Sequence, residues 1–174
     1  MTNKILVTYA SRSGSTAGVA EAIGKTLAEA GADVDVRPVE AVSDLSPYTS
    51  VVAGSAIQGG KWLPEALDFV RTHRAELARK RFAAFLVCIT LSMQGGEQYR
   101  SHADTWHDPV RALVRPVSTE VFAGALEFSK MPRTFNAQIG MRLPVLFGMW
   151  KTGDHRDWRK IRAWAERLRP LLVG

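Results

Sequence analysis

Short apolar runs alternate along this chain with longer stretches in which apolar residues recur at helical spacing. The apolar runs predict β-strands at 4–8, 33–38, 50–55, 82–89 and 120–126. The stretches between and after them predict α-helices at 17–30, 64–78, 97–114 and 158–168. Several of the strands lack polar alternation, as strands do when helices cover both faces of a parallel sheet. The pattern therefore predicts an α/β fold with a doubly wound sheet.

The first predicted strand leads into a turn rich in hydroxyl side chains, which comes directly before the first helix. A helix start offers unpaired backbone N–H groups and the positive end of the helix dipole, and serine and threonine add further donors. The turn is therefore predicted to hold the phosphate group of a cofactor. A capped turn without a ligand is the alternative, although a cap needs only one hydroxyl. The candidate residues are Ser11, Arg12, Ser13, Gly14, Ser15 and Thr16.

Two further loops follow strands of the same predicted sheet, at 54–62 and 90–96. In doubly wound folds the ligand lies beyond the carboxyl ends of the strands, where these loops and the hydroxyl-rich turn meet. Glycine lets backbone amides approach a flat ligand more closely than larger residues do. Such an approach is expected at Gly54, Gly59, Gly60, Gly95 and Gly96.

The spacing Ser11-x-Ser13-Gly14-x-Thr16 resembles the T-x-T-G-x-T phosphate signature of the flavodoxins. The resemblance implies flavin mononucleotide (FMN) as the cofactor and a five-stranded sheet in the order 2-1-3-4-5. It also implies that the other two loops clasp the isoalloxazine ring, with Trp62 either stacked on the ring or packed at a helix start. The residues that this assigns to the ring are Ser55, Ala56, Ile57, Gln58, Gly59, Thr90, Leu91, Ser92, Met93 and Gly95.

Composition narrows the function further. The 174 residues fit a single domain, 1–174, and carry a formal net charge of +6, which favours anionic partners. Nucleic acid is not an expected partner, because the basic residues form no block and no nucleic-acid-binding motif is present. Flavodoxins that carry electrons between proteins are typically acidic, so the charge argues against that role. The single cysteine, Cys88, lies in a predicted strand and is expected in the core.

An apolar segment with basic residues, at about 127–153, separates the last predicted strand from the last helix. Within it, 130–151 combines methionine, phenylalanine, leucine and tryptophan with lysine and arginine. Such a segment is typical of a peripheral contact with an anionic membrane or of a lid over an apolar ligand, and it is too interrupted to span a bilayer. A packed loop or a dimer contact is the alternative.

With this insertion the chain resembles the menaquinone-dependent protoporphyrinogen oxidases of the flavodoxin superfamily. The matching segments are 54–57, 122–126, the insertion and 154–158. The resemblance implies an FMN-dependent oxidoreductase that passes electrons from protoporphyrinogen IX to a quinone, in the cytoplasm or at the inner face of the membrane. It implies no acid–base residue, because the flavin itself moves the electrons. An electron carrier for a protein partner, or the same fold with a deazaflavin, remains open.

One group of side chains has the composition of a metal site. His102, Asp104, His107 and Asp108 lie close in sequence, but the two histidines are five residues apart and do not share a helix face. A solvated helix start is therefore predicted, with no metal.

Overall fold

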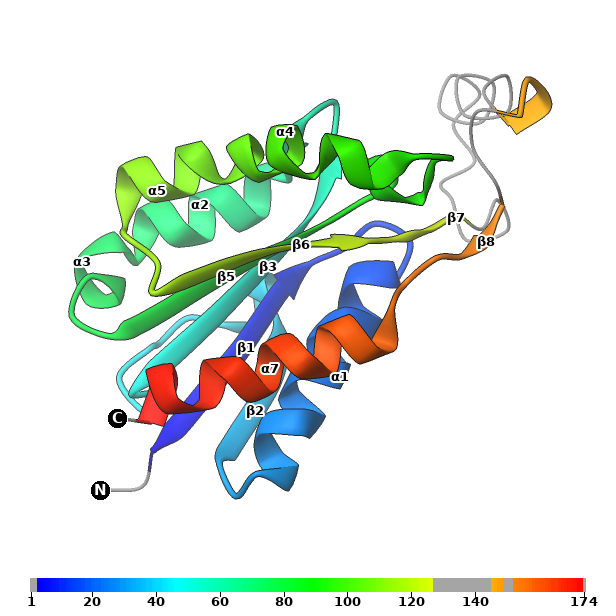
Figure 1. Ribbon diagram of the computed structural model, residues 1–174. Helices are drawn as coiled ribbons and strands as arrows, with labels where there is room; N and C mark the ends of the chain where they lie inside the picture. The colour runs from blue at the N-terminus through cyan, green and yellow to red at the C-terminus, as the bar shows by residue number, and fades with distance from the viewer. Residues whose placement is uncertain (1–2, 127–144, 149–151, 174) are drawn as a thin grey trace.

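The computed structural model describes residues 3–126, 145–148 and 152–173. Five parallel strands form its central sheet, in the spatial order β2-β1-β3-β5-β6 (Figure 1). They are β1 (Lys4–Ala10), β2 (Asp33–Pro38), β3 (Ser50–Gln58), β5 (Arg81–Cys88) and β6 (Ser118–Ala123). Counted along the chain as parallel strands, this is the order 2-1-3-4-5, so the predicted fold class is confirmed.

Helices cover both faces of the sheet (Figure 1). Helices α1 (Ser15–Glu29) and α7 (Trp158–Val173) share one face. The other face carries α2 (Pro64–Thr72), α3 (Arg74–Leu77), α4 (Arg100–Asp104) and α5 (Asp108–Leu113). Successive residues of β1 enter opposite layers, because Ile5 and Val7 pack with the α1 and α7 side while Leu6 packs with the other. Two apolar layers therefore bury the strands, as their uninterrupted hydrophobicity predicts.

The predicted helix at 97–114 is wrong as a single element. The chain there forms the 3₁₀ turn η3 (Gly96–Tyr99), then α4, a second 3₁₀ turn η4 (Thr105–His107), and α5. Pro109 stands in the first turn of α5 and has no N–H to donate to the preceding turn. In addition, Thr105 Oγ1 donates to the carbonyl of His102 at 2.6 Å. The segment remains helical in outline but changes its hydrogen-bonding pattern at each of these points.

Gly54 serves the core rather than a ligand. A Cβ at this position of β3 would lie only 2.0 Å from Cζ of Phe85 on the neighbouring strand β5. The Phe85 ring is fully buried and meets Trp164 of α7 edge-on, with ring centroids 6.1 Å apart. The expectation that Gly54 lets an amide approach a flat ligand is therefore replaced by a packing role.

The two ends of the predicted insertion come together. Strand β7 (Ala125–Leu126) pairs antiparallel with β8 (Gly153–Asp154), just before α7 begins. Of the predicted membrane contact at 130–151, only 145–148 belong to the described residues. Across the described ranges, no helix has the length and apolar character needed to cross a bilayer.

Candidate functional site

The three loops singled out in the sequence lie side by side. They follow β1, β3 and β5, which are neighbours in the sheet and run in the same direction. The carboxyl ends of these strands therefore bring the loops to one edge of the sheet (Figure 1). This is the edge at which a ligand binds in a doubly wound fold.

The first loop is shaped as an anion seat. Ser11 Oγ accepts a hydrogen bond from the backbone N–H of Gly14 at 3.1 Å and closes the turn. Gly14 has a φ of 85°, in the left-handed region that favours glycine, and α1 begins at Ser15. Helix α1 has neither a capping side chain at its start nor an acidic residue in its first turn. Its positive end is therefore left for a ligand.

Thr16 gives a second, independent sign of a ligand. Its side chain is fully buried, and Oγ1 has no hydrogen-bond partner among the described residues. A buried hydroxyl without a partner costs about 1–3 kcal/mol. An anion on the helix start would accept this hydrogen bond, so the residues of the loop fit a phosphate group.

The second loop is a short hairpin. Strand β3 continues to Gln58 and pairs with β4 (Lys61–Trp62) across Gly59 and Gly60, whose φ angles of 56° and 73° suit a two-residue turn. Ser55, Ala56, Ile57 and Gln58 thus lie at the end of a strand rather than in an open loop. The Ser55 hydroxyl accepts the N–H of Leu63 at 2.9 Å and donates to the carbonyl of Ala56 at 2.7 Å. Ser55 therefore holds the hairpin in place.

The third loop folds back on itself. It contains the 3₁₀ turn η2 (Thr90–Ser92), Met93, and Gly95 with a φ of 69°. The N–H of Gly96 donates to the carbonyl of Met93 at 2.8 Å. A Cβ on Gly96 would lie 2.6 Å from the carbonyl oxygen of Thr90, so this glycine is needed by the turn itself. Thr90, Leu91, Ser92, Met93 and Gly95 are thereby brought beside the hairpin, at the end of the adjacent strand.

Arg156 reaches the first loop from the far end of the chain, and sequence reasoning missed it. Its Nη1 donates to the carbonyl of Ser15 at 3.3 Å, and a Cβ on Gly18 would lie 2.6 Å from the same nitrogen. Asp154 holds the guanidinium through two hydrogen bonds of 2.7 Å, and the Trp158 ring lies 4.5 Å from it. A positive charge is thus fixed beside the first turn of α1. The 154–158 motif contained this residue, but its role depends on a contact 141 residues away.

A second arginine connects the first loop to the helix that follows the hairpin. Arg12, in the first loop, forms a two-pronged ion pair with Glu65, in the first turn of α2, and one prong measures 3.0 Å from Nη2 to Oε2. The pair raises the pKa of Arg12, and its hydrogen bond holds the pKa of the Glu65 carboxyl below its ordinary value. Arg12 was predicted to contact the phosphate, and its partner Glu65 was not foreseen.

The prediction of a solvated helix start at 102–108 is wrong for His107. Its side chain is fully buried, with Nε2 at 3.2 Å from the carbonyl oxygen of Glu120 and the ring against Trp62, centroid to centroid 5.7 Å. Burial lowers the pKa of His107 to about 4. Trp62 is itself buried, so it packs here rather than in an open position on a ligand.

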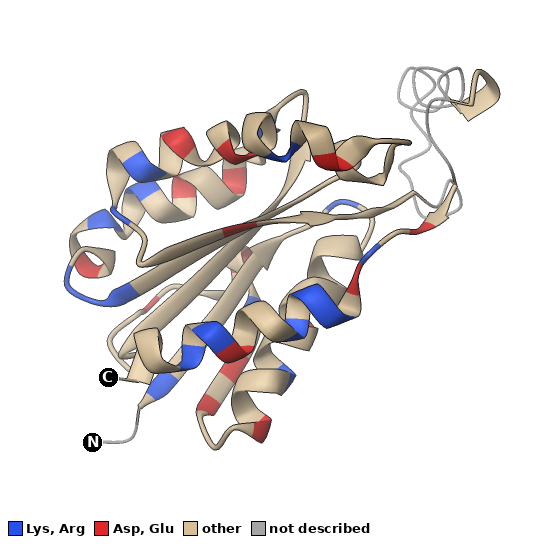
Figure 2. Cartoon of the chain, viewed as in Figure 1, with Lys and Arg blue, Asp and Glu red and all other residues tan. Residues whose placement is uncertain are grey.

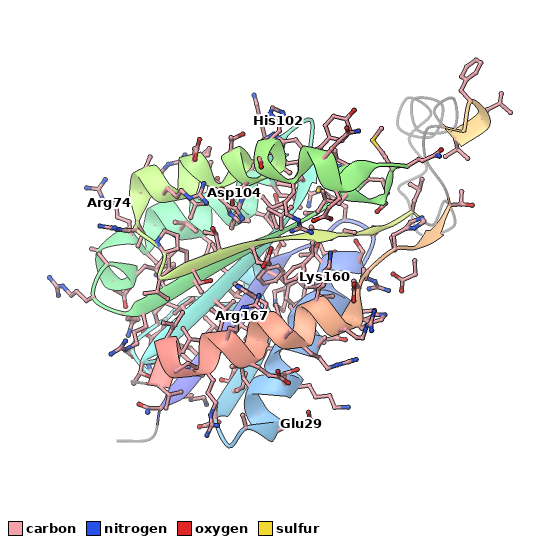
Figure 3. The ribbon with its side chains drawn as sticks, in the orientation of Figure 1. Glu29, Arg74, His102, Asp104, Lys160 and Arg167 are labelled. Atoms are coloured by element: carbon pink, nitrogen blue, oxygen red, sulfur yellow. The ribbon has the colours of Figure 1, made fainter. Side chains whose placement is uncertain are left out.

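The remaining members of that group contact other side chains of the fold. His102, labelled in Figure 3, meets the Trp106 ring edge-on. Asp104, labelled there too, binds the Arg111 guanidinium at 2.8 and 2.9 Å, and Asp108 binds the same guanidinium at 3.1 Å. Over the described ranges, no cluster of three potential metal ligands is found.

A pocket of about 310 Å³ lies along the outer edge of β6 and is lined by charged side chains. Lys160 and Arg167 reach it from α7, a helix whose exposed face is strongly basic (Figures 2 and 3). The backbone of Val121 is occupied on this side, because its N–H donates to Glu120 Oε1 at 3.0 Å and its carbonyl accepts from Arg100 Nη1 at 2.7 Å. Arg100 and Glu120 are also paired, at 3.1 Å. The charged side chains that line the pocket are therefore already paired with one another.

Comparison with known proteins identifies the domain. A family model described as a flavodoxin domain matches residues 6–157. A flavodoxin from the domain Archaea has a similar structure, with a TM-score of 0.61 and 19% identity over 98% of this chain and 99% of that one. A flavodoxin from the TIGR4 strain of Streptococcus pneumoniae gives a TM-score of 0.60 and 18% identity over 96% and 98% of the two chains.

The same fold also occurs inside a larger protein. Rubredoxin oxygen:oxidoreductase from Desulfovibrio gigas matches with a TM-score of 0.54 and 16% identity over 99% of this chain, but only 38% of that chain is covered. A comparison with curated protein sequences gave no match. At these identities the solved structures show a shared fold.

Proposed function

Since this chain belongs to the flavodoxin domain family and FMN is the cofactor of that family, we propose that it is an oxidoreductase that passes electrons from a porphyrinogen-like reductant through FMN to a quinone. FMN would supply the electron-transfer chemistry. The hydroxyl-rich loop and the start of α1 would hold its phosphate, with the buried Thr16 hydroxyl as one donor. The hairpin and the third loop would flank its ring.

The observation that carries the quinone assignment is the exposed apolar pair in the insertion. Leu146 is 79% exposed and Phe147 is 76% exposed, far more than other large apolar side chains of the described residues. Exposed aromatic and aliphatic side chains in a segment with basic residues favour contact with a membrane surface or with an apolar substrate. The net charge of +6 favours a substrate that carries carboxylates and an anionic membrane.

The test is anaerobic oxidation of a porphyrinogen by the purified protein, with a quinone as acceptor in vesicles that contain anionic lipid. We expect turnover in the wild type and at least fivefold less quinone reduction in the Leu146→Ser/Phe147→Ser variant. Leu171→Ser is the matched control. Leu171 is a 40% exposed apolar residue near the C-terminal end of α7, away from the insertion. Equal rates in the double variant and the wild type would remove the role of the insertion.

An electron carrier for a protein partner is the second candidate, and the similarity to solved flavodoxins favours it. It predicts no turnover with any porphyrinogen, while the bound flavin still accepts electrons from dithionite. The absorption spectrum of the extracted cofactor separates FMN from a deazaflavin.

Thr16→Val tests the phosphate seat directly. Valine keeps the shape of threonine but removes the hydroxyl that lacks a partner. We therefore expect the affinity for FMN to fall about tenfold. In the cofactor-free protein, the free energy of unfolding should stay the same or rise by up to about 1 kcal/mol. Fluorescence titration and urea unfolding measure the two effects.

The control for this prediction lies on the same helix. Thr26 Oγ1 donates to the carbonyl of Ala22 at 2.9 Å, so Thr26→Val removes a satisfied hydroxyl away from the loop. Its FMN affinity should match the wild type. If Thr16→Val also binds FMN as the wild type does, the phosphate is not held by this hydroxyl.

A further inference from the structure

The ion pair of Arg12 and Glu65 connects two of the segments that would surround the proposed cofactor, the first loop and the chain that follows the hairpin. Arg12 is the one charged residue of the first loop, 11–16. Glu65 follows the β3–β4 hairpin closely, in the first turn of α2. The two side chains come from positions 53 residues apart and are 40% and 24% exposed.

The geometry of the pair fixes how Arg12 and Glu65 are oriented relative to each other. Both terminal nitrogens of the guanidinium face the carboxylate, one on each oxygen. A planar two-pronged pair fixes orientation as well as distance, unlike a contact between point charges. The start of α2 is in turn tied to the hairpin, because the N–H of Leu63 donates to Ser55 Oγ at 2.9 Å. A displacement of one loop is thus resisted by the other.

From this arrangement we propose that the Arg12–Glu65 pair is a latch, which holds the first loop and the hairpin together around the flavin and sets how fast the flavin leaves. The inference rests on FMN as the cofactor. In this role Arg12 and Glu65 are positioning residues, and the latch acts on the whole flavin. It slows the release of riboflavin and of FMN alike.

Direct attraction of the phosphate by Arg12 would behave differently. In that case Glu65 competes with the phosphate for the guanidinium, and its removal tightens FMN while riboflavin is unaffected. The structure favours the latch, because both carboxylate oxygens of Glu65 are engaged by the guanidinium.

The experiment measures dissociation of FMN and of riboflavin from the full-length protein, by recovery of flavin fluorescence after dilution. Glu65→Gln and Arg12→Gln should each release both flavins about fivefold faster, and the double variant no faster than either. The exchanged pair, Arg12→Glu with Glu65→Arg, should return riboflavin release to within about twofold of the wild type. Asp68→Asn is the control, because it breaks the Asp68–Arg71 pair on the same helix without touching a loop.

A second readout needs no flavin. In the cofactor-free protein, Glu65→Gln should raise amide hydrogen exchange in 11–16 and leave the thermal midpoint nearly unchanged, because an exposed pair adds little to global stability. Unchanged flavin release in Glu65→Gln overturns the latch, and so does slower release of FMN alone. The proposal is also overturned if the variant with the exchanged pair releases riboflavin as fast as the single variants do. If the wild type binds neither flavin, the cofactor assignment fails as well.

Discussion

Gly54→Ala should lower the free energy of unfolding by about 3 kcal/mol or more, because the added methyl group would overlap the ring of Phe85. The new Cβ would lie 2.0 to 2.4 Å from three carbons of that ring. The ring has nowhere to move, since it is fully buried between Trp164 and Phe122, with centroids at 6.1 and 6.2 Å. Urea unfolding of the cofactor-free protein measures the loss.

A compensating substitution tests the cause. Phe85→Leu removes part of the ring that the methyl group would meet, so the double variant with Gly54→Ala should lose less stability than the two single effects added together. Such coupling would identify steric overlap as the cause. A Gly54→Ala protein within about 1 kcal/mol of the wild type would contradict the packing role assigned to this glycine.

The second large effect is a loss of stability in acid that depends on His107. Its pKa is about 4 in the folded protein and about 6.5 when unfolded, because burial disfavours the charged ring. Between these two pKa values the unfolded chain binds more protons than the folded protein does. The free energy of unfolding is therefore highest above pH 6.5 and declines as the pH falls towards 4. The full loss is about 3 kcal/mol. Denaturant unfolding at a series of pH values measures it.

His107→Gln should flatten that decline. Glutamine can still donate to the carbonyl of Glu120 but has no proton to gain. His102→Gln is the matched control, because His102 is an exposed histidine in the same helical segment. The carboxylates of Asp104 and Asp108 and the guanidinium of Arg111 also act on His107, and they are kept in both variants. A pH profile that persists in His107→Gln would assign the acid sensitivity to other groups.

The sheet could be predicted from the sequence because its signals are local. Runs such as 82–89 are apolar without alternation, which is typical of a strand buried on both faces. The order of the strands in the sheet was predicted from the family resemblance. The first loop was recognisable for a similar reason, since a strand end, four hydroxyl residues and a helix start follow one another directly. These features need no knowledge of distant residues.

The features that were not predicted depend on distant contacts. Nothing in the residues near Arg12 indicates Glu65, and nothing near Gly18 indicates the guanidinium of Arg156. The position of His107 was misjudged because the sequence groups it with His102, Asp104 and Asp108, while its neighbours in space are Trp62 and the Glu120 carbonyl of β6. Gly54 was interpreted as a ligand contact because the partner of its missing Cβ lies on the adjacent strand.

The side chains paired along β6 have a consequence for assembly. Glu120 accepts the N–H of Val121 and Arg100 donates to its carbonyl, and an incoming β-strand would need both groups in order to extend the sheet. At the opposite border, β2 ends in Pro38 and carries charged residues, and both features discourage strand addition. Both outer strands of the sheet therefore carry features that disfavour the addition of a further strand, and with it fibril growth by extension of the sheet.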